Sequence, residues 1–199
     1  MMGRSLLLLA FCGFGTAVAQ TTPAVPYQAL TGSERWALYR DQTWLSPDFY
    51  MGAVVAAGFS QSVPDPPEWG KGVSGYGRRA ASWMGVFGIE ETVHHGGAAL
   101  LGYDPRYARC GCKGFFRRSG HAIKWSLVTK DRAGRTRLDF PALAGAYGGG
   151  MLSTYWYPSR FQPLTDGVRT GTQEMGFVIV FHLIDEFTPE MKRLFTGKH

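Results

Sequence analysis

Small, apolar and polar residues recur along most of this chain at spacings of three and four positions, which is the period of an α-helix. The longest such segment, residues 70–103, contains no proline. Its small residues at helical spacing are Ser74, Gly77, Ala81, Gly85, Gly88, Thr92 and Gly96. On a helix they form one strip, along which another backbone can approach closely. We predict a central packing helix here, with a break near Gly96 and Gly97.

Start signals divide the rest of the chain into further helices. Thr31 and Glu34 have the spacing of a capping box, and Ser46 with Pro47 combines a hydroxyl cap with proline at the first helical position. Asp139, with Pro141 near the first turn, opens a later helix. The predicted helices span residues 34–43, 49–60, 140–159 and 166–187, with a short terminal helix capped by Thr188. Residues 140–159 carry no charge, which is compatible with a membrane-spanning segment or with a helix buried in a bundle.

The segment 115–138 fits two interpretations. A helix over 116–129 is our first prediction, yet Ile123, Trp125 and Leu127 alternate with polar residues as in a strand. In the second interpretation, the turn at 131–134 closes a β-hairpin. The predicted fold is therefore mainly α, a compact bundle of five or six glycine-rich helices that leaves room for one short β-hairpin near 122–138.

The beginning of the chain has the pattern of a secretion signal. Arg4 precedes an apolar run, and small residues at 17–19 form a cleavage site. The predicted division is a signal peptide over 1–19, a flexible leader over 20–30 and a single helical domain over 31–199. We therefore expect an exported protein, located in the periplasm or associated with the outer membrane.

The charge balance is basic. The sequence contains 21 Lys and Arg against 15 Asp and Glu, and loss of Arg4 with the signal peptide leaves 20 basic residues and a net charge of +5. This balance suits either anionic lipid head groups or an ordinary solvated surface, whereas nucleic acid is not an expected partner of an exported chain. Cys110 and Cys112 are separated by one residue, so we expect either two free thiols in a loop or a strained disulfide bridge.

Charged residues stand among the glycines and apolar residues, where a buried charge needs a partner. Three Glu and His pairs are four positions apart, so each lies side by side on its helix: Glu90 with His94, Glu91 with His95, and Glu186 with His182. We predict these ion pairs, and expect Arg78 or Arg79 to meet one of the glutamates across a helix interface. The candidate polar cluster is Arg78, Arg79, Glu90, Glu91, His94, His121, Arg160, His182 and Glu186.

Facing helices that carry Glu and His also build metal sites in bundles. A metal-binding bundle that uses Glu90, His94, His182 and Glu186 is therefore an alternative hypothesis. The bundle motif has Glu-x-x-His spacing, however, whereas the spacing here is Glu-x-x-x-His. We predict no metal and no cofactor.

Three short segments resemble the motifs of the type 2 phosphatidic acid phosphatase family: Lys71 with Arg78, Ser119-Gly120-His121, and Ser159-Arg160. The resemblance implies that Lys71, Arg78 and Arg160 hold phosphate and that His121 acts as an acid. The chain departs from the family at the nucleophile, because Asp166 stands where its histidine belongs. A lipid or phosphoester hydrolase with Arg78, Arg79, His121 and Arg160 around the substrate is thus a second alternative.

A broader resemblance covers most of the chain after the leader. The segments WGKGVSGYGRR, DPRY, RRSGHA and YWYP are similar to those of a family of exported bacterial proteins to which no activity is assigned. The resemblance implies export and a shared fold. Our leading hypothesis is a non-enzymatic, envelope-associated helical protein with a structural or binding role, whose partner is a membrane, an anionic lipid surface or an envelope protein.

Overall fold

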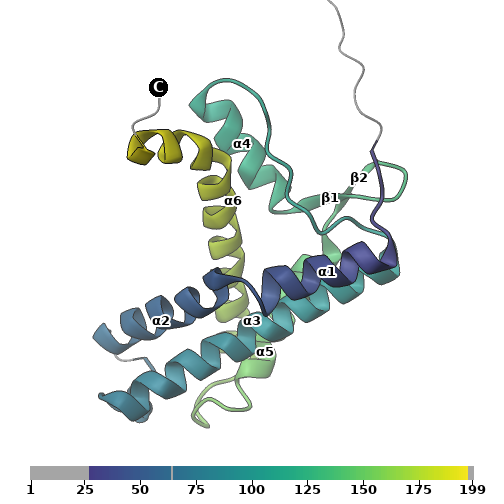
Figure 1. The fold of residues 1–199 in the computed structure, drawn as a ribbon. Helices are drawn as coiled ribbons and strands as arrows, with labels where there is room; N and C mark the ends of the chain where they lie inside the picture. Colours follow the sequence, from purple (N-terminus) through teal and green to yellow (C-terminus); the bar gives the residue numbers. More distant parts are fainter. Residues whose placement is uncertain (1–26, 64, 197–199) are drawn as a thin grey trace, which may run out of the picture.

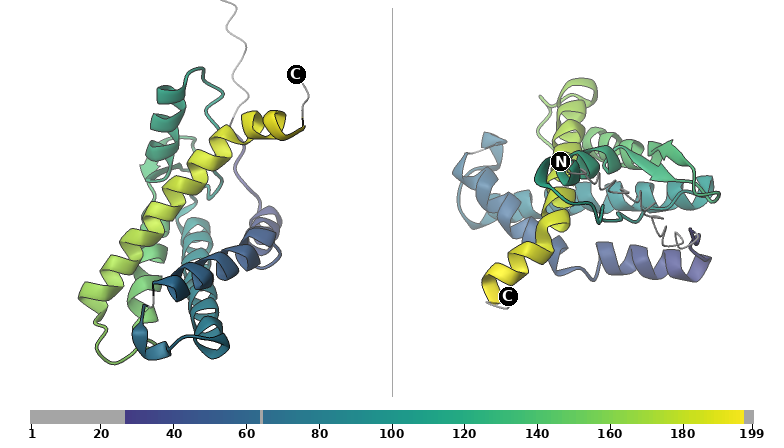
Figure 2. Two further views of the ribbon diagram at one scale, coloured as in Figure 1. Left: turned by 90° about the vertical axis from the view of Figure 1, so that its left-hand side faces the viewer. Right: turned by 90° about the horizontal axis from the view of Figure 1, so that it is seen from above.

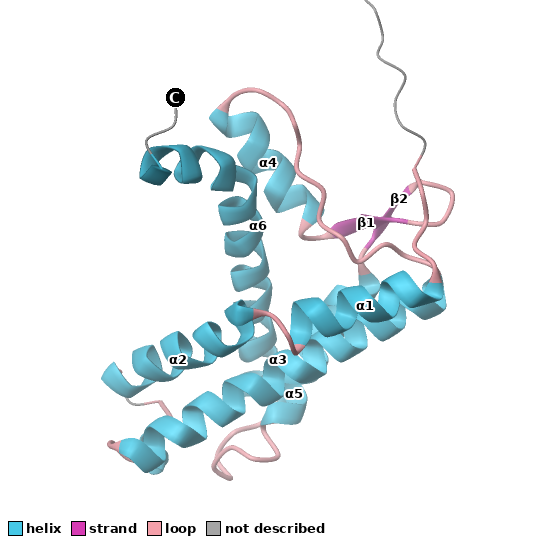
Figure 3. Ribbon diagram, in the orientation of Figure 1, coloured by secondary structure: helices cyan, strands magenta, loops and turns pink. Residues whose placement is uncertain are grey.

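The computed structural model describes residues 27–63 and 65–196, and the predicted signal peptide lies outside these ranges. Within them the chain forms six α-helices and one two-stranded antiparallel sheet (Figure 1, Figure 3). The predicted mainly α bundle with a short β-hairpin is confirmed. None of the helices in the described ranges has both the length and the apolar character needed to cross a bilayer.

The first two helices begin at the predicted signals. In α1 (Gly32–Thr43), the Thr31 hydroxyl accepts from the Glu34 N–H and the Glu34 carboxylate accepts from the Thr31 N–H at 2.7 Å, which completes the capping box. Helix α2 (Pro47–Ser62) starts with its proline. A short 3₁₀ turn, η1 (Pro67–Trp69), then leads into the next helix.

Helix α3 (Val73–Leu101) is continuous, so the predicted break at Gly96 and Gly97 is wrong. Pro141 packs onto Gly97, where an added Cβ would lie 3.0 Å from the proline Cβ. The glycine therefore makes room for a neighbouring helix without interrupting its own. The helix ends at Gly102, whose φ of 70° is in the left-handed region that glycine adopts without steric cost.

The segment with two interpretations contains both a helix and a hairpin. Helix α4 spans Phe115–Trp125, strand β1 Val128–Lys130 and strand β2 Thr136–Leu138. Ile123 and Trp125 are helical, so strand alternation through them is wrong and the hairpin begins further along. The Asp131 carboxylate accepts from the N–H groups of Ala133 and Arg135 at 2.9 and 3.0 Å, which closes the turn.

Helix α5 (Phe140–Ser153) begins as predicted, with Asp139 accepting from the Ala142 N–H, but it ends before the uncharged segment does. A π-helical turn, η2 (Pro163–Gly167), precedes α6 (Val168–Thr196). Helix α6 continues through Pro189, so the prediction of a separate terminal helix is wrong. Its last turns bend away from the rest of the helix, as expected where proline removes a backbone hydrogen bond (Figure 1).

Glycines bring α3, α5 and α6 into backbone contact. A Cβ at Gly145 of α5 would lie 2.5 Å from the Glu90 carbonyl oxygen of α3. At the contact between α5 and the start of α6, a Cβ at Gly167 or Gly171 would lie 2.6 or 2.7 Å from a backbone Cα of α5. Small residues therefore set the spacing of these three helices.

The strip of small residues predicted on α3 does not bring another helix into backbone contact. No atom lies within 4 Å of a Cβ built at Gly77, and Gly85 and Gly88 face tryptophan side chains at 3.5 and 3.1 Å. Helix α5 packs instead on the face of α3 that carries Val86 and Glu90. Spacing alone locates a strip on a helix, but does not say which face the neighbouring helix covers.

Candidate functional site

Two carboxyl groups lie on the central helices, one of them buried and the other partly buried. Glu90 on α3 is 5% exposed, and burial, together with the charges of Glu174 and Glu91, raises its pKa to about 8. Burial also raises the pKa of Glu174 on α6 to about 7. Glu90 therefore keeps its proton at neutral pH, and its side chain stays in the core as an uncharged group.

A second polar group, which consists of Glu91, His94 and His95, begins directly after Glu90 on α3. Glu91 Oε2 lies 3.2 Å from His95 Nε2, which confirms this predicted pair. The predicted pair of Glu90 and His94 is wrong, because His94 Nε2 lies 3.5 Å from Asp139 Oδ2 at the start of α5. Burial lowers the pKa of His94, but Asp139 and Glu91 more than offset this effect, so the pKa is raised.

Glu91, His94 and His95 converge. One potential metal-ligand atom from each lies within 4.8 Å of the other two, and no other group of three or more such side chains does so in the described part of the chain. The Nε2 atom of His94 is buried and has no hydrogen-bond partner among the residues that the structure describes. These three residues, with Asp139 beside them, are the described groups best placed to hold a metal ion.

Helix α1 covers this group with aromatic side chains. The Tyr39 ring lies 5.5 Å from the His95 ring, and its hydroxyl is 2.8 Å from the Thr92 hydroxyl of α3. The Trp44 Nε1–H donates to the same tyrosine hydroxyl at 3.0 Å. These contacts hold Tyr39 in place and restrict the orientation of the His95 imidazole.

Glu186 on α6 is a buried charge, 1% exposed. Its carboxylate accepts from the Tyr107 hydroxyl at 2.6 Å, the Cys110 N–H at 3.1 Å and Arg118 Nε at 3.3 Å. Burial acts to raise the pKa of Glu186, but these donors outweigh it, so the pKa is lowered and the group stays charged. Cys110 is disulfide-bonded to Cys112, so Glu186 ties the disulfide loop to α6.

The predicted pair of His182 and Glu186 is not formed. His182 Nδ1 lies 2.8 Å from the Ser126 hydroxyl, and its ring stacks on Tyr107 with 4.0 Å between centroids. Burial lowers the pKa of His182 to about 4, so the imidazole is neutral at neutral pH. Because Glu186 is held by other donors, the four ligands of the predicted metal-binding bundle do not converge.

Arg79 is also buried, but its partners are backbone carbonyls and a side-chain amide in place of a carboxylate. Its guanidinium donates to Pro66 O at 2.8 Å, to Gly70 O at 2.9 Å and to the Gln61 amide oxygen at 2.9 Å. It thereby fastens the turn before α3 to the first turns of that helix. The prediction that Arg78 or Arg79 meets a core glutamate is wrong, because Arg78 lies on the surface beside a groove.

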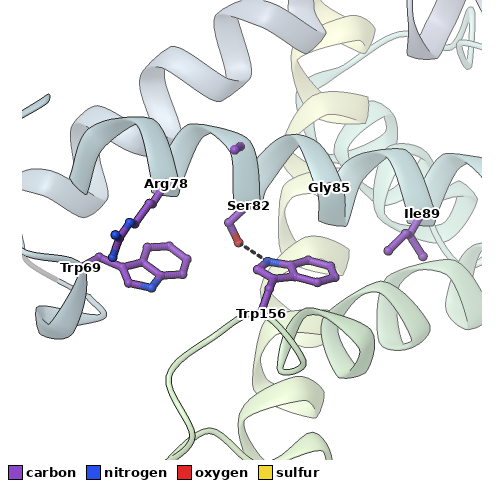
Figure 4. A pocket seen from close by; sticks show the side chains of 7 residues that line it. Trp69, Arg78, Ser82, Gly85, Ile89 and Trp156 are labelled. Carbon is purple, nitrogen blue, oxygen red and sulfur yellow. Dashed lines mark hydrogen bonds between the residues drawn. The ribbon is translucent and has the colours of Figure 1, made fainter. Parts of the chain in front are cut away.

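That groove, of about 640 Å³, follows α3 (Figure 4). It is lined by Trp69, Arg78, Ala81, Ser82, Gly85, Ile89 and Trp156. The Trp156 Nε1–H donates to the Ser82 hydroxyl at 2.8 Å, which fixes the indole ring against the helix. Part of the small-residue strip that is predicted to receive another helix thus lines an open groove.

The residues that resemble phosphatase motifs do not gather around one site. On α4, His121 Nε2 lies 2.8 Å from Ala108 O of the preceding loop, whereas Arg160 pairs with Glu68 at 2.6 Å. Helix α4 and the beginning of α3, which carries Arg78, lie at opposite ends of the molecule (Figure 1, Figure 2). This separation places His121 far from Arg78, so the four residues do not surround one substrate.

An apolar face of α6 is exposed. Phe177, Val180, Phe181 and Ile184, here called the α6 stripe, are each between 48% and 53% exposed and follow helical spacing. Phe187, one turn beyond Ile184, stacks on Phe115 of α4 with 5.3 Å between centroids. Phe115 is 64% exposed and Phe116 is 87% exposed, so the stripe continues onto the first turn of α4.

Comparison of the chain with protein-family models, with curated proteins and with solved structures finds no match in any of the three. These groups and surfaces are therefore the basis for a function.

Several groups around these sites are not identified by the sequence analysis. Asp139 is recognised there only as the start of a helix, because a carboxylate at this position is explained by capping alone. Glu174 and Tyr107 carry no signal, because neither stands at helical spacing from a partner on its own segment. Their importance comes from contacts between elements distant in the sequence.

Proposed function

We propose that this protein is an exported, envelope-associated binding protein that attaches to anionic lipid surfaces through the α6 stripe and the adjoining first turn of α4. The observation that carries this proposal is the exposed stripe itself. A helix in a water-soluble bundle normally buries the face on which apolar residues recur at three and four positions. Exposed apolar side chains grouped in this way mark an interaction surface.

The charges around the stripe favour an anionic lipid surface over an apolar protein partner. Two nearby acids are already paired, Asp185 with Arg109 at 2.5 Å and Glu190 with Arg118 at 2.6 Å. The exposed side chains of Lys113 and Arg117 flank Phe115 and Phe116, and Arg193 is exposed near the end of α6. Basic groups that surround aromatic side chains suit a surface with apolar acyl chains below anionic head groups.

The expected binding is reversible. Transfer of a half-exposed stripe side chain from water into lipid contributes about 1 kcal/mol, and each basic side chain near an anionic surface contributes about 1 kcal/mol. The stripe and its basic rim together are comparable to a single lipid anchor, which binds membranes weakly and reversibly. Attachment should therefore weaken when salt screens the charges.

Vesicle flotation tests the proposal. The chain from residue 20 onward is mixed with vesicles of phosphatidylcholine alone or with phosphatidylglycerol added, and floated through a density gradient. We expect flotation only with the anionic vesicles, and loss of flotation in high salt. Phe181→Glu and Phe116→Glu should abolish it. Leu100→Glu, at a site on α3 that is 88% exposed and outside the stripe, is the matched control and should float like the wild type.

Flotation that is absent with anionic vesicles, or unchanged by both stripe variants, would refute the proposal. A second outcome would also refute it: the chain self-associates by light scattering, Phe181→Glu removes the self-association, and no vesicle binding is found. The stripe would then be an interface between copies of the chain. Export is tested separately by fractionating cells that express the full chain. Recovery in the cytosol with residues 1–19 still attached would contradict it.

A further inference from the structure

A metal-binding group on α3 is independent of the proposed lipid surface. His94 and His95 stand three and four positions after Glu91, so one face of the helix presents all three side chains. The group lies at the edge of the core, because the side chains of Glu91 and His94 are 20% and 18% exposed while that of His95 is 6% exposed. An ion can reach it from solvent and would then be shielded by the protein.

The distances suit a small divalent cation. Zinc holds nitrogen and oxygen ligands at about 2.0–2.2 Å, which places two ligands of a tetrahedral ion about 3.3–3.6 Å apart. His95 Nε2 and Glu91 Oε2 are 3.2 Å apart, and His94 Nε2 and Asp139 Oδ2 are 3.5 Å apart. The three potential ligand atoms on α3 lie within 4.8 Å of one another, so small side-chain rotations complete the set.

The lack of a hydrogen bond at a buried nitrogen of His94 points to a ligand. A buried polar atom without a hydrogen bond costs free energy, and native structures rarely leave one unpaired. His94 Nε2 is such an atom, and its nearest carboxylate, at 3.5 Å, does not make a hydrogen bond with it. A bound cation would satisfy this nitrogen and, at the same time, the carboxylates on either side.

We propose that Glu91, His94 and His95 bind one divalent transition-metal ion, with Zn²⁺ preferred, and that Asp139 supplies a second negative charge beside His94. Two imidazoles and a carboxylate form a donor set of the kind that zinc takes, and two carboxylates balance the charge of a divalent ion. Asp139 Oδ1 accepts from the Ala142 N–H at 3.1 Å, which fixes the orientation of the carboxylate. Tyr39, in contact with His95, positions the imidazole from the other side.

Zinc titration of the untagged chain, followed by calorimetry and by metal analysis after dialysis, tests this site. We expect saturable binding of a single ion per chain, and a visible absorption band when Co²⁺ replaces Zn²⁺. Glu91→Gln and His94→Ala should abolish saturable binding. Asp139→Asn, which retains the ability to cap α5, should weaken binding about tenfold.

Two matched variants separate the site from unspecific binding. Glu90→Gln changes the adjacent carboxyl group, and His121→Asn removes a histidine on α4, so both should bind zinc like the wild type. Thermal melts by circular dichroism establish that each variant is folded. If His94→Ala does not fold, Glu91→Gln decides, since it has nearly the same size and shape. Absence of saturable binding, or equal binding by Glu91→Gln and Glu90→Gln, would overturn the assignment.

Discussion

Replacement of Gly145 by alanine tests whether α3 and α5 meet backbone to backbone. The added methyl group would lie 2.5 Å from the Glu90 carbonyl oxygen, 3.2 Å from its carbon and 3.3 Å from its Cα. All three atoms belong to the backbone of α3, so no side-chain rotation relieves the contact. The helices must separate by most of an ångström to restore ordinary van der Waals distances.

The free energy of unfolding reflects two opposing effects. Alanine stabilises a helix interior relative to glycine by about 1 kcal/mol. Overpacking of a rigid contact costs about 1–3 kcal/mol, and a backbone neighbour places Gly145→Ala at the upper end of that range. We therefore expect a net loss of about 2 kcal/mol. Gly148→Ala, in the same helix with no atom within 4 Å, should gain up to about 1 kcal/mol.

Urea unfolding followed by far-UV circular dichroism measures both variants, with an unchanged m-value as evidence that the same cooperative unit unfolds. Gly149→Ala supplies an intermediate case, because its methyl group would lie 3.2 Å from the Val86 carbonyl oxygen. The expected order of stability is Gly148→Ala, then Gly149→Ala, then Gly145→Ala. Equal stability of the first and last variants would show that α3 and α5 are not in backbone contact at this position.

Three further predictions concern the buried polar groups. The carboxyl of Glu174 ionises near pH 7 when folded and near 4.5 when unfolded, so folded chains hold more protons between these values and stability falls as pH rises through them. Glu174→Gln should therefore be more stable than wild type at pH 8, by up to about 3 kcal/mol, and equally stable at pH 4.5. Urea unfolding that shows the same difference in stability at both pH values would contradict this account. Arg79→Lys should lower the free energy of unfolding by about 2 kcal/mol, because a lysine cannot reach three acceptors in the same fork geometry, whereas exposed Arg78→Lys should change it little. Tyr107→Phe removes the 2.6 Å hydrogen bond to the buried Glu186 carboxylate and should cost about 2 kcal/mol in the same assay; an unchanged midpoint would mean that the bond is not formed in solution.

Signals confined to a few neighbouring residues predicted the elements of this fold well. The capping box of Thr31 and Glu34, proline at the start of α2 and Asp139 ahead of α5 each act within one helical turn, so their meaning does not depend on the rest of the chain. Two of the exceptions are helices that continue through residues that often interrupt a helix. Helix α3 continues through Gly96 and Gly97, and α6 continues through Pro189.

Residues of the candidate site were predicted in part, because spacing along a helix fixes only which side chains share a face. That argument succeeds for Glu91 and His95, which meet on α3. It fails for Glu90 and His94, because Asp139 lies against the histidine from another helix. Their partners depend on which helices pack together.

The sequence by itself determined that the chain is a mainly α bundle, that small residues allow close packing, and where most helices start, while it left the hairpin as one of two interpretations. Only the tertiary structure decided that α5 packs on the face of α3 with Val86 and Glu90, and that part of the glycine strip lines a groove. It also brought Asp139 beside His94 and left the α6 stripe exposed. The physical reason is that helical periodicity is set by local backbone geometry, whereas the choice among several apolar or small faces depends on the packing of all the helices at once.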